Sequence, residues 1–232
     1  MRIFRDRVEA GAALGERLNA LGLGENVVVL GLPRGGVPVA REVAAVLHAP
    51  LDVLVVRKLG APFNPELALG AIAFGGVTVY NRELVEALGL DQSALDGERR
   101  REQAELERRE RAYRGELPMP DLEGKTVVLV DDGIATGATM QAAITATRAL
   151  HPTRIVAAAP TSACDTFARL EQVADFVVVL ATPEPYLGVG AWYEQFRQLS
   201  DEEVVRCLEE GAAHDVARAK APNGAHSPAR RS

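Results

Sequence analysis

Residues 127–139 read VVLVDDGIATGAT, and this stretch decides the fold class. Its four leading apolar residues indicate a fully buried strand. Asp131 and Asp132 follow at the C-terminal end of that strand, and a loop of small residues leads into a predicted helix over Met140–Leu150. In an open α/β sheet, ligands bind at the carboxyl ends of the strands. The stretch therefore predicts a strand–loop–helix unit with a ligand site at the loop.

The loop after the two acids is suited to a phosphate group. A helix N-terminus offers backbone N–H groups and the positive end of the helix dipole, and Thr136 and Thr139 add hydroxyl donors. The two carboxylates would repel a phosphate, so they suit sugar hydroxyls or a cation held by the ligand. Together these features predict a site for a phosphorylated sugar.

The same thirteen residues resemble the 5-phosphoribosyl-1-diphosphate (PRPP) binding motif of type I phosphoribosyltransferases. That motif has four apolar residues, two acids, a short spacer and then Thr-Gly-x-Thr, and every position is matched. The resemblance implies that Asp131 and Asp132 bind the ribose hydroxyls. It also implies that the following loop cradles the 5-phosphate, through Gly133, Ala135, Thr136, Gly137, Ala138 and Thr139.

A second glycine-rich turn, GLPRGG at residues 31–36, follows a predicted strand over Asn26–Leu30. Glycines let the backbone approach a ligand closely, and Arg34 adds a cation that does not deprotonate. In the family that the first motif resembles, the matching turn binds pyrophosphate, often with a non-proline cis peptide. The resemblance thus implies that Arg34, Gly35 and Gly36 contact pyrophosphate. The alternative is an ordinary glycine-rich turn between a strand and a helix.

Strand and helix patterns alternate over most of the chain. This alternation predicts an α/β fold with a doubly wound, mainly parallel five-stranded sheet and right-handed crossovers. The strands are expected at Asn26–Leu30, Leu51–Val56, Thr126–Val130, Arg154–Ala159 and Asp175–Leu180. The helices are expected at Phe4–Leu21, Val37–Leu47, Met140–Leu150 and Cys164–Val173. By resemblance this is the type I phosphoribosyltransferase fold, with a small hood built from about residues 1–24 and 182–212.

Two segments interrupt the alternation. Arg57 and Lys58 are expected to end the second strand at the ligand-binding edge. The resemblance makes them the start of a flexible loop whose basic residues neutralise the departing diphosphate, although basic residues at a strand end are also ordinary surface chemistry. The glycines and prolines of 59–81 predict an irregular loop over 59–70 and then a hairpin around Gly75-Gly76. The charged run 82–114 predicts an exposed helix.

Aromatic residues after the fifth strand are candidates for binding the base. Tyr186, Trp192 and Tyr193 could stack on a planar heterocycle. Alternatively, they pack the C-terminal segment. Ala135 stands where hypoxanthine-guanine-type members have a proton-transferring Asp, which weighs against a 6-oxopurine.

Composition limits the class of protein. The chain of 232 residues is 47% apolar with a net charge of −6, which predicts one globular domain over 1–212 and argues against a nucleic-acid binder. Residues from Ala213 to 232 have no periodicity and predict a disordered tail. Cys164 and Cys207 are isolated, and apolar runs are short, so we expect a cytoplasmic protein with no membrane segment. Assembly into a homo-oligomer is left open.

The resemblance implies that the chain transfers a phosphoribosyl group from PRPP to a nitrogenous base and releases pyrophosphate, or catalyses the reverse. By resemblance, Mg²⁺ is required, and Arg34, Lys58, Asp131 and Asp132 carry the chemistry. The metal ligands would come mainly from PRPP, with the two acids contributing through water. One alternative is a regulatory protein that binds PRPP or a nucleotide without catalysis, and another is a different phosphosugar enzyme on the same kind of sheet.

Overall fold

The computed structural model describes residues 3–115, 117–118 and 120–220. Its centre is a parallel sheet of five strands in the order β2-β1-β6-β7-β8. The strands are β1 (Val27–Gly31), β2 (Leu51–Val53), β6 (Thr126–Val130), β7 (Arg154–Thr161) and β8 (Phe176–Ala181). The predicted α/β fold with a doubly wound five-stranded sheet is confirmed.

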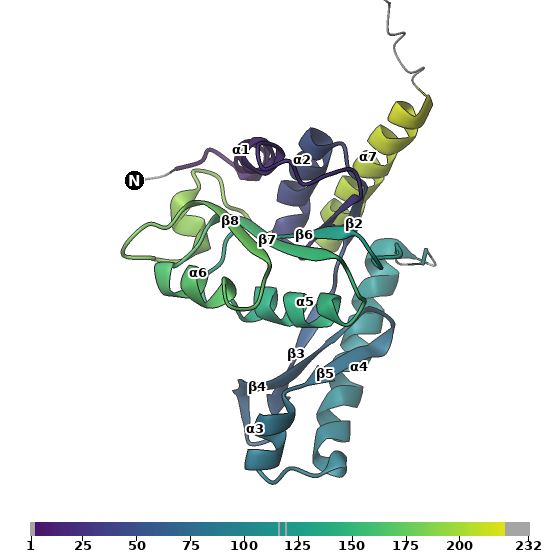
Figure 1. The fold of residues 1–232 in the computed structure, drawn as a ribbon, viewed down its shortest axis with the longest axis vertical. Helices are drawn as coiled ribbons and strands as arrows, with labels where there is room; N and C mark the ends of the chain where they lie inside the picture. The colour runs from purple at the N-terminus through teal and green to yellow at the C-terminus, as the bar shows by residue number, and fades with distance from the viewer. Residues whose placement is uncertain (1–2, 116, 119, 221–232) are drawn as a thin grey trace, which may run out of the picture.

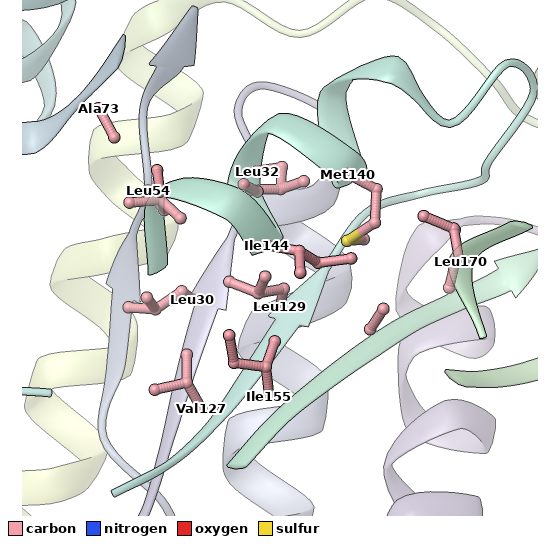
Figure 2. Close-up of a cluster of buried hydrophobic side chains, with 14 of the residues drawn as sticks. Leu30, Leu32, Leu54, Ala73, Val127, Leu129, Met140, Ile144, Ile155 and Leu170 are labelled. Carbon is pink, nitrogen blue, oxygen red and sulfur yellow. The ribbon is translucent and has the colours of Figure 1, made fainter. Parts of the chain in front are cut away.

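Helices cover both faces of this sheet (Figure 1). One face packs against α1 (Arg7–Asn19) and α2 (Gly36–Leu47), and the other against α5 (Ala138–Arg148) and α6 (Cys164–Leu170). Alternate residues of β6 supply the two cores, as a strand buried on both sides requires. Val128 and Val130 face α1 and α2, whereas Val127 and Leu129 face α5 and α6. Figure 2 shows the second of these cores around Leu129 and Ile144.

A smaller unit projects from the sheet, and we call residues 56–114 the arm (Figure 1). It has an antiparallel sheet of β3 (Val56–Ala61), β4 (Asn64–Ala73) and β5 (Val77–Tyr80), followed by α3 (Arg82–Ala87) and α4 (Gln92–Arg114). Ala73 of β4 packs into the same core as Leu54 and Ile144, which anchors the base of the arm (Figure 2).

The arm differs in several respects from what the sequence predicts. The predicted strand over 51–56 is wrong, because β2 ends at Val53 and β3 starts at Val56 in a different sheet. The irregular loop over 59–70 is also wrong, because most of it forms the β3–β4 hairpin. The turn at Gly75-Gly76 is confirmed, with φ of 65° and 75°. The charged helix is interrupted before α4, at Gly89 with φ of 62°, and α4 buries Leu106 and Tyr113.

The last described element is α7 (Asp201–Lys220), which packs against α2 and α4. The prediction of disorder from Ala213 is therefore wrong as far as Lys220, and residues 221–232 lie outside the described part of the chain. Across the described ranges, the helices are all too short or too polar to cross a membrane.

Candidate functional site

The two loops singled out by sequence lie side by side at the carboxyl edge of the sheet. Strands β1 and β6 are neighbours, with Gly31 paired to Val130. The Leu32 N–H donates to the Val130 carbonyl at 2.8 Å. A Cβ atom on Gly36 would lie 2.8 Å from Cα of Asp131, so glycine is needed for this approach. The Pro33–Arg34 peptide bond is cis, as the resemblance implied.

Of the two acids, Asp132 makes the stronger contacts with other side chains of the protein. This carboxylate is buried, and its Oδ2 accepts a 2.8 Å hydrogen bond from Nε of Arg7 and lies 2.8 Å from NH2 of the same guanidinium. Asp131 is half-buried, and its Oδ1 accepts from the Asp132 N–H at 2.8 Å. Burial raises the pKa of Asp132, although Arg7 opposes this shift. Burial and the neighbouring charge of Asp132 hold the pKa of Asp131 well above its ordinary value.

The loop over 133–139 is open on one side and supported from the other. Ala135, Thr136, Ala138 and Thr139 are exposed. From α6, Thr166 Oγ1 donates to the Ala135 carbonyl at 2.7 Å, and NH2 of Arg169 donates to the Thr136 carbonyl at 3.3 Å.

Gly137 caps α5 in the left-handed region with φ of 77°. The loop thus ends at a helix whose first amide groups have no acceptors within the helix. Gly133 is buried, and a Cβ atom there would overlap Val189.

Arg34 lies in the glycine-rich turn, but its guanidinium is directed to α7. Its Nε is 3.0 Å from Oδ1 of Asp201, and NH1 donates to the Leu199 carbonyl at 2.8 Å. The Tyr113 hydroxyl donates to the same Asp201 oxygen at 2.7 Å. Asp201 therefore joins the turn to both α4 and α7.

Arg57 and Lys58 belong to the arm, so their expected position at the end of a strand of the main sheet is wrong. Nε of Arg57 donates to Glu102 of α4 at 2.6 Å. Lys58 lines a cavity of about 330 Å³ together with Ala138 and Thr139 of α5. The arm therefore brings Lys58 beside the start of α5, which the linear sequence does not indicate.

The three aromatic candidates occupy different environments. Tyr193 is only 1% exposed, and its ring centroid lies 5.1 Å from that of Phe196. Its hydroxyl donates to the Asp132 carbonyl at 2.5 Å. Tyr193 is thus a packing residue, the alternative that the sequence left open, and its ring has no face free for a base.

Trp192 is 8% exposed, and its indole Nε1 has no hydrogen-bond partner within the described ranges. Tyr186 is half-buried, with its hydroxyl 3.0 Å from Oγ1 of Thr161 and its ring centroid 6.0 Å from that of Trp192. Of the three, Tyr186 remains the best placed for contact with a ligand.

The sequence of this chain is similar to those of known proteins. The model of the phosphoribosyl transferase domain family matches residues 7–180. Two Mycobacterium tuberculosis proteins, from strains CDC 1551 and H37Rv, are each named "Putative phosphoribosyl transferase" and are 52% identical over 98% of this chain. The chain spans about half (51%) of the length of these relatives.

A solved structure provides a comparison of fold. The crystal structure of the protein TT1426 from Thermus thermophilus is 47% identical, with a TM-score of 0.85 over 90% of this chain and 99% of that one. The family match, which covers most of the residues from α1 to β8, has the acid pair and both loops within it. This chain belongs to the phosphoribosyl transferase domain family.

Proposed function

We propose that this chain transfers the 5-phosphoribosyl group of PRPP to a nitrogenous acceptor and releases pyrophosphate, or catalyses the reverse. The observation that carries the proposal is the contact between the turn at residues 33–36 and the acid pair. It brings the small-residue loop at 133–139, the two carboxylates and the glycine-rich turn together at one edge of the sheet. PRPP has a phosphate, a ribose and a diphosphate in the same order.

Each part of the ligand has a candidate partner. The open loop at 135–139 and the N-terminus of α5 would hold the 5-phosphate. Asp131 would accept hydrogen bonds from the ribose hydroxyls, because Asp132 already accepts from Arg7. Gly35 and Gly36 would offer close backbone approach to the diphosphate, and Lys58 would add positive charge from the arm.

Catalysis would rest on position and charge. The bond from C1′ to the diphosphate oxygen breaks and the acceptor nitrogen bonds to the opposite face of C1′, so configuration inverts. Positive charge develops on the ribose while the diphosphate leaves with its electron pair. Groups already fixed in place stabilise that separation without rearranging. Arg34 would have to turn from Asp201 to reach the diphosphate.

The carboxylates at the site could bind Mg²⁺ together with the phosphates of PRPP. Within the described ranges no group of three or more Asp, Glu, His or Cys residues could hold a metal alone. Mg²⁺ is commonly bound by one or two carboxylates together with substrate phosphates and water. Asp131 would contribute the carboxylate, and the bound ion would offset the charge of the diphosphate.

The planar acceptor would lie near Tyr186. The Tyr186 hydroxyl forms a hydrogen bond with Oγ1 of Thr161. That oxygen adjoins Gly133, because a Cβ atom built on Gly133 would lie 3.1 Å from it. The ring is therefore close to the loop that follows the acid pair.

Measurements of binding and of turnover test the proposal. PRPP with Mg²⁺ should bind in a calorimetric titration and raise the melting temperature, because a ligand that binds only the folded state stabilises it. Release of pyrophosphate should then be followed across a panel of nitrogenous bases. Binding without release for any base would support the regulatory alternative, and no binding at millimolar PRPP would overturn both.

A further inference from the structure

Arg7 is a buried cation in contact with the acid pair. It is the first residue of α1 and is only 9% exposed. Two of its nitrogens, Nε and NH2, lie 2.8 Å from the same carboxylate oxygen of Asp132. Both side chains are about nine-tenths buried, with exposed fractions of 10% and 12%. A pair this buried is sensitive to the loss of either partner, because the remaining charge would be left desolvated.

The other sides of the Arg7 guanidinium are also occupied. NH1 donates to the Arg197 carbonyl at 3.0 Å, and the ring centroid of Phe196 lies 4.0 Å from the guanidinium carbon. The flat guanidinium is therefore held in one orientation by the segment after β8. Lysine could not reproduce this set of contacts, since it lacks the planar fork of donors.

Asp132 is fixed at both its side chain and its backbone. Its carboxylate abuts Gly35, where a Cβ atom would lie 2.5 Å from the carboxylate carbon. Its carbonyl accepts the Tyr193 hydroxyl. The same residue thus connects α1, the turn at 33–36 and the segment after β8. Asp131 differs, because it is less enclosed and its carboxylate accepts from the Asp132 N–H.

We infer that Arg7 is a positioning residue, which acts through Asp132 to hold the acid pair and the diphosphate turn in register for a phosphoribosyl ligand. This inference rests on the proposed function. It assigns the two acids different roles. Asp131 contacts the sugar, whereas Asp132 with Arg7 fixes the positions of Asp131 and the turn at 33–36. The 5-phosphate loop at 135–139 has its own supports from α6 and does not need Arg7.

The test compares Arg7→Lys with Arg17→Lys, a matched change at an exposed arginine of the same helix. Both variants keep the charge, so each should fold, which circular dichroism and melting temperature will check. Arg7→Lys should weaken PRPP binding by about tenfold while changing inorganic phosphate binding by less than about twofold. Arg17→Lys should change neither affinity.

A double-mutant cycle separates action through Asp132 from an independent effect. If Arg7 acts through Asp132, then Arg7→Lys combined with Asp132→Asn should lose no more PRPP affinity than the weaker-binding single variant. Additive losses would contradict the inference. Equal losses of PRPP and phosphate affinity in Arg7→Lys would mean that Arg7 only stabilises the fold, which would overturn the inference. Unchanged affinities in this variant would also overturn it. Absence of PRPP binding by the unmodified protein would instead overturn the proposed function.

Discussion

Gly35 and the carboxylate of Asp132 are packed so closely that no side chain fits between them. A Cβ atom on Gly35 would lie 2.5 Å from Cγ of Asp132 and closer still to Oδ2. The backbone of Gly35 has φ of −64° and ψ of −34°, which any residue can adopt. Glycine is therefore required here for space, and the turn at 33–36 and the acid pair form one packed unit.

Gly35→Ala should weaken PRPP binding by at least about tenfold, because the methyl group must displace the Asp132 carboxylate. Calorimetric titration measures the effect. Gly97→Ala is the matched control, since nothing lies within 4 Å of a Cβ at that helical position. The control should keep its affinity and gain about 0.5–1 kcal/mol in the free energy of unfolding. Unchanged affinity in Gly35→Ala would show that the turn and the carboxylate can separate at little cost.

Asp201→Asn should strengthen pyrophosphate binding by up to about fivefold. The change removes the charge that competes for Arg34, while the amide oxygen can still accept from Tyr113. The gain is small because this ion pair is partly exposed, and such pairs contribute about 1 kcal/mol or less. Titration with pyrophosphate measures it, and Glu209→Gln on the exposed face of α7 serves as the control. Weaker binding would mean that Asp201 orients Arg34 for the ligand.

Glu110 should make stability depend on pH. Burial raises the pKa of this carboxyl to about 7, and its Oε1 has no hydrogen-bond partner within the described ranges. The folded protein keeps this proton up to about pH 7, whereas an unfolded glutamate loses it near 4.5. The free energy of unfolding should therefore fall as pH rises through this range.

Glu110→Gln removes that contribution. The variant should gain about 1–2 kcal/mol over the unmodified protein between pH 5 and pH 8, a value discounted because the carboxyl is only half-buried. Melting temperatures at both pH values measure the difference, with the exposed Glu171→Gln as control. The raised pKa values of Asp131 and Asp132 act in both proteins and cancel. An identical pH dependence in variant and unmodified protein would contradict the assignment.

Hydrogen exchange should be uneven along the β3–β4 hairpin. Residues 70–73 pair with both β3 and β5, so their amides should exchange slowly in the free protein. The tip at 61–64 follows register shifts around Gly60 and should exchange faster. If the arm closes over PRPP, the tip should become protected when PRPP and Mg²⁺ are bound. Unchanged exchange at the tip would rule out closure by this hairpin.

The position of the loop over 133–139 could be predicted because its signal is local. A buried strand, two acids and a run of small residues follow one another without a gap at 127–139, and parallel topology then places them at one edge. The adjacent turn at 31–36 has the same property. Neither prediction required knowledge of a distant residue.

The expectation for 51–56 failed because burial continues where the strand does not. Leu54 and Val55 are 0% and 2% exposed, although they belong to neither strand and only link β2 of one sheet to β3 of the other. An apolar run therefore cannot show where the chain leaves one sheet for another. Arg57 and Lys58 were misplaced for this reason.

Arg7 was missed because it lies in a charged part of the sequence. Arg5, Asp6 and Glu9 lie within two positions of it, and the charged residues of the predicted helix are otherwise expected to face water. Its partner, Asp132, is 125 positions away. The sequence alone contains no pattern that marks one arginine of this set as buried.

The packing of the segment after β8 against the acid pair has an optical consequence. Trp192 is the single tryptophan of the chain, and it is buried next to Tyr193, whose hydroxyl touches the Asp132 carbonyl. Light that excites indole alone therefore reports from one place, next to the tyrosine that bonds to Asp132. A shift in the emission wavelength on addition of PRPP would show that the surroundings of Trp192 change when the site is filled, without any label attached to the protein.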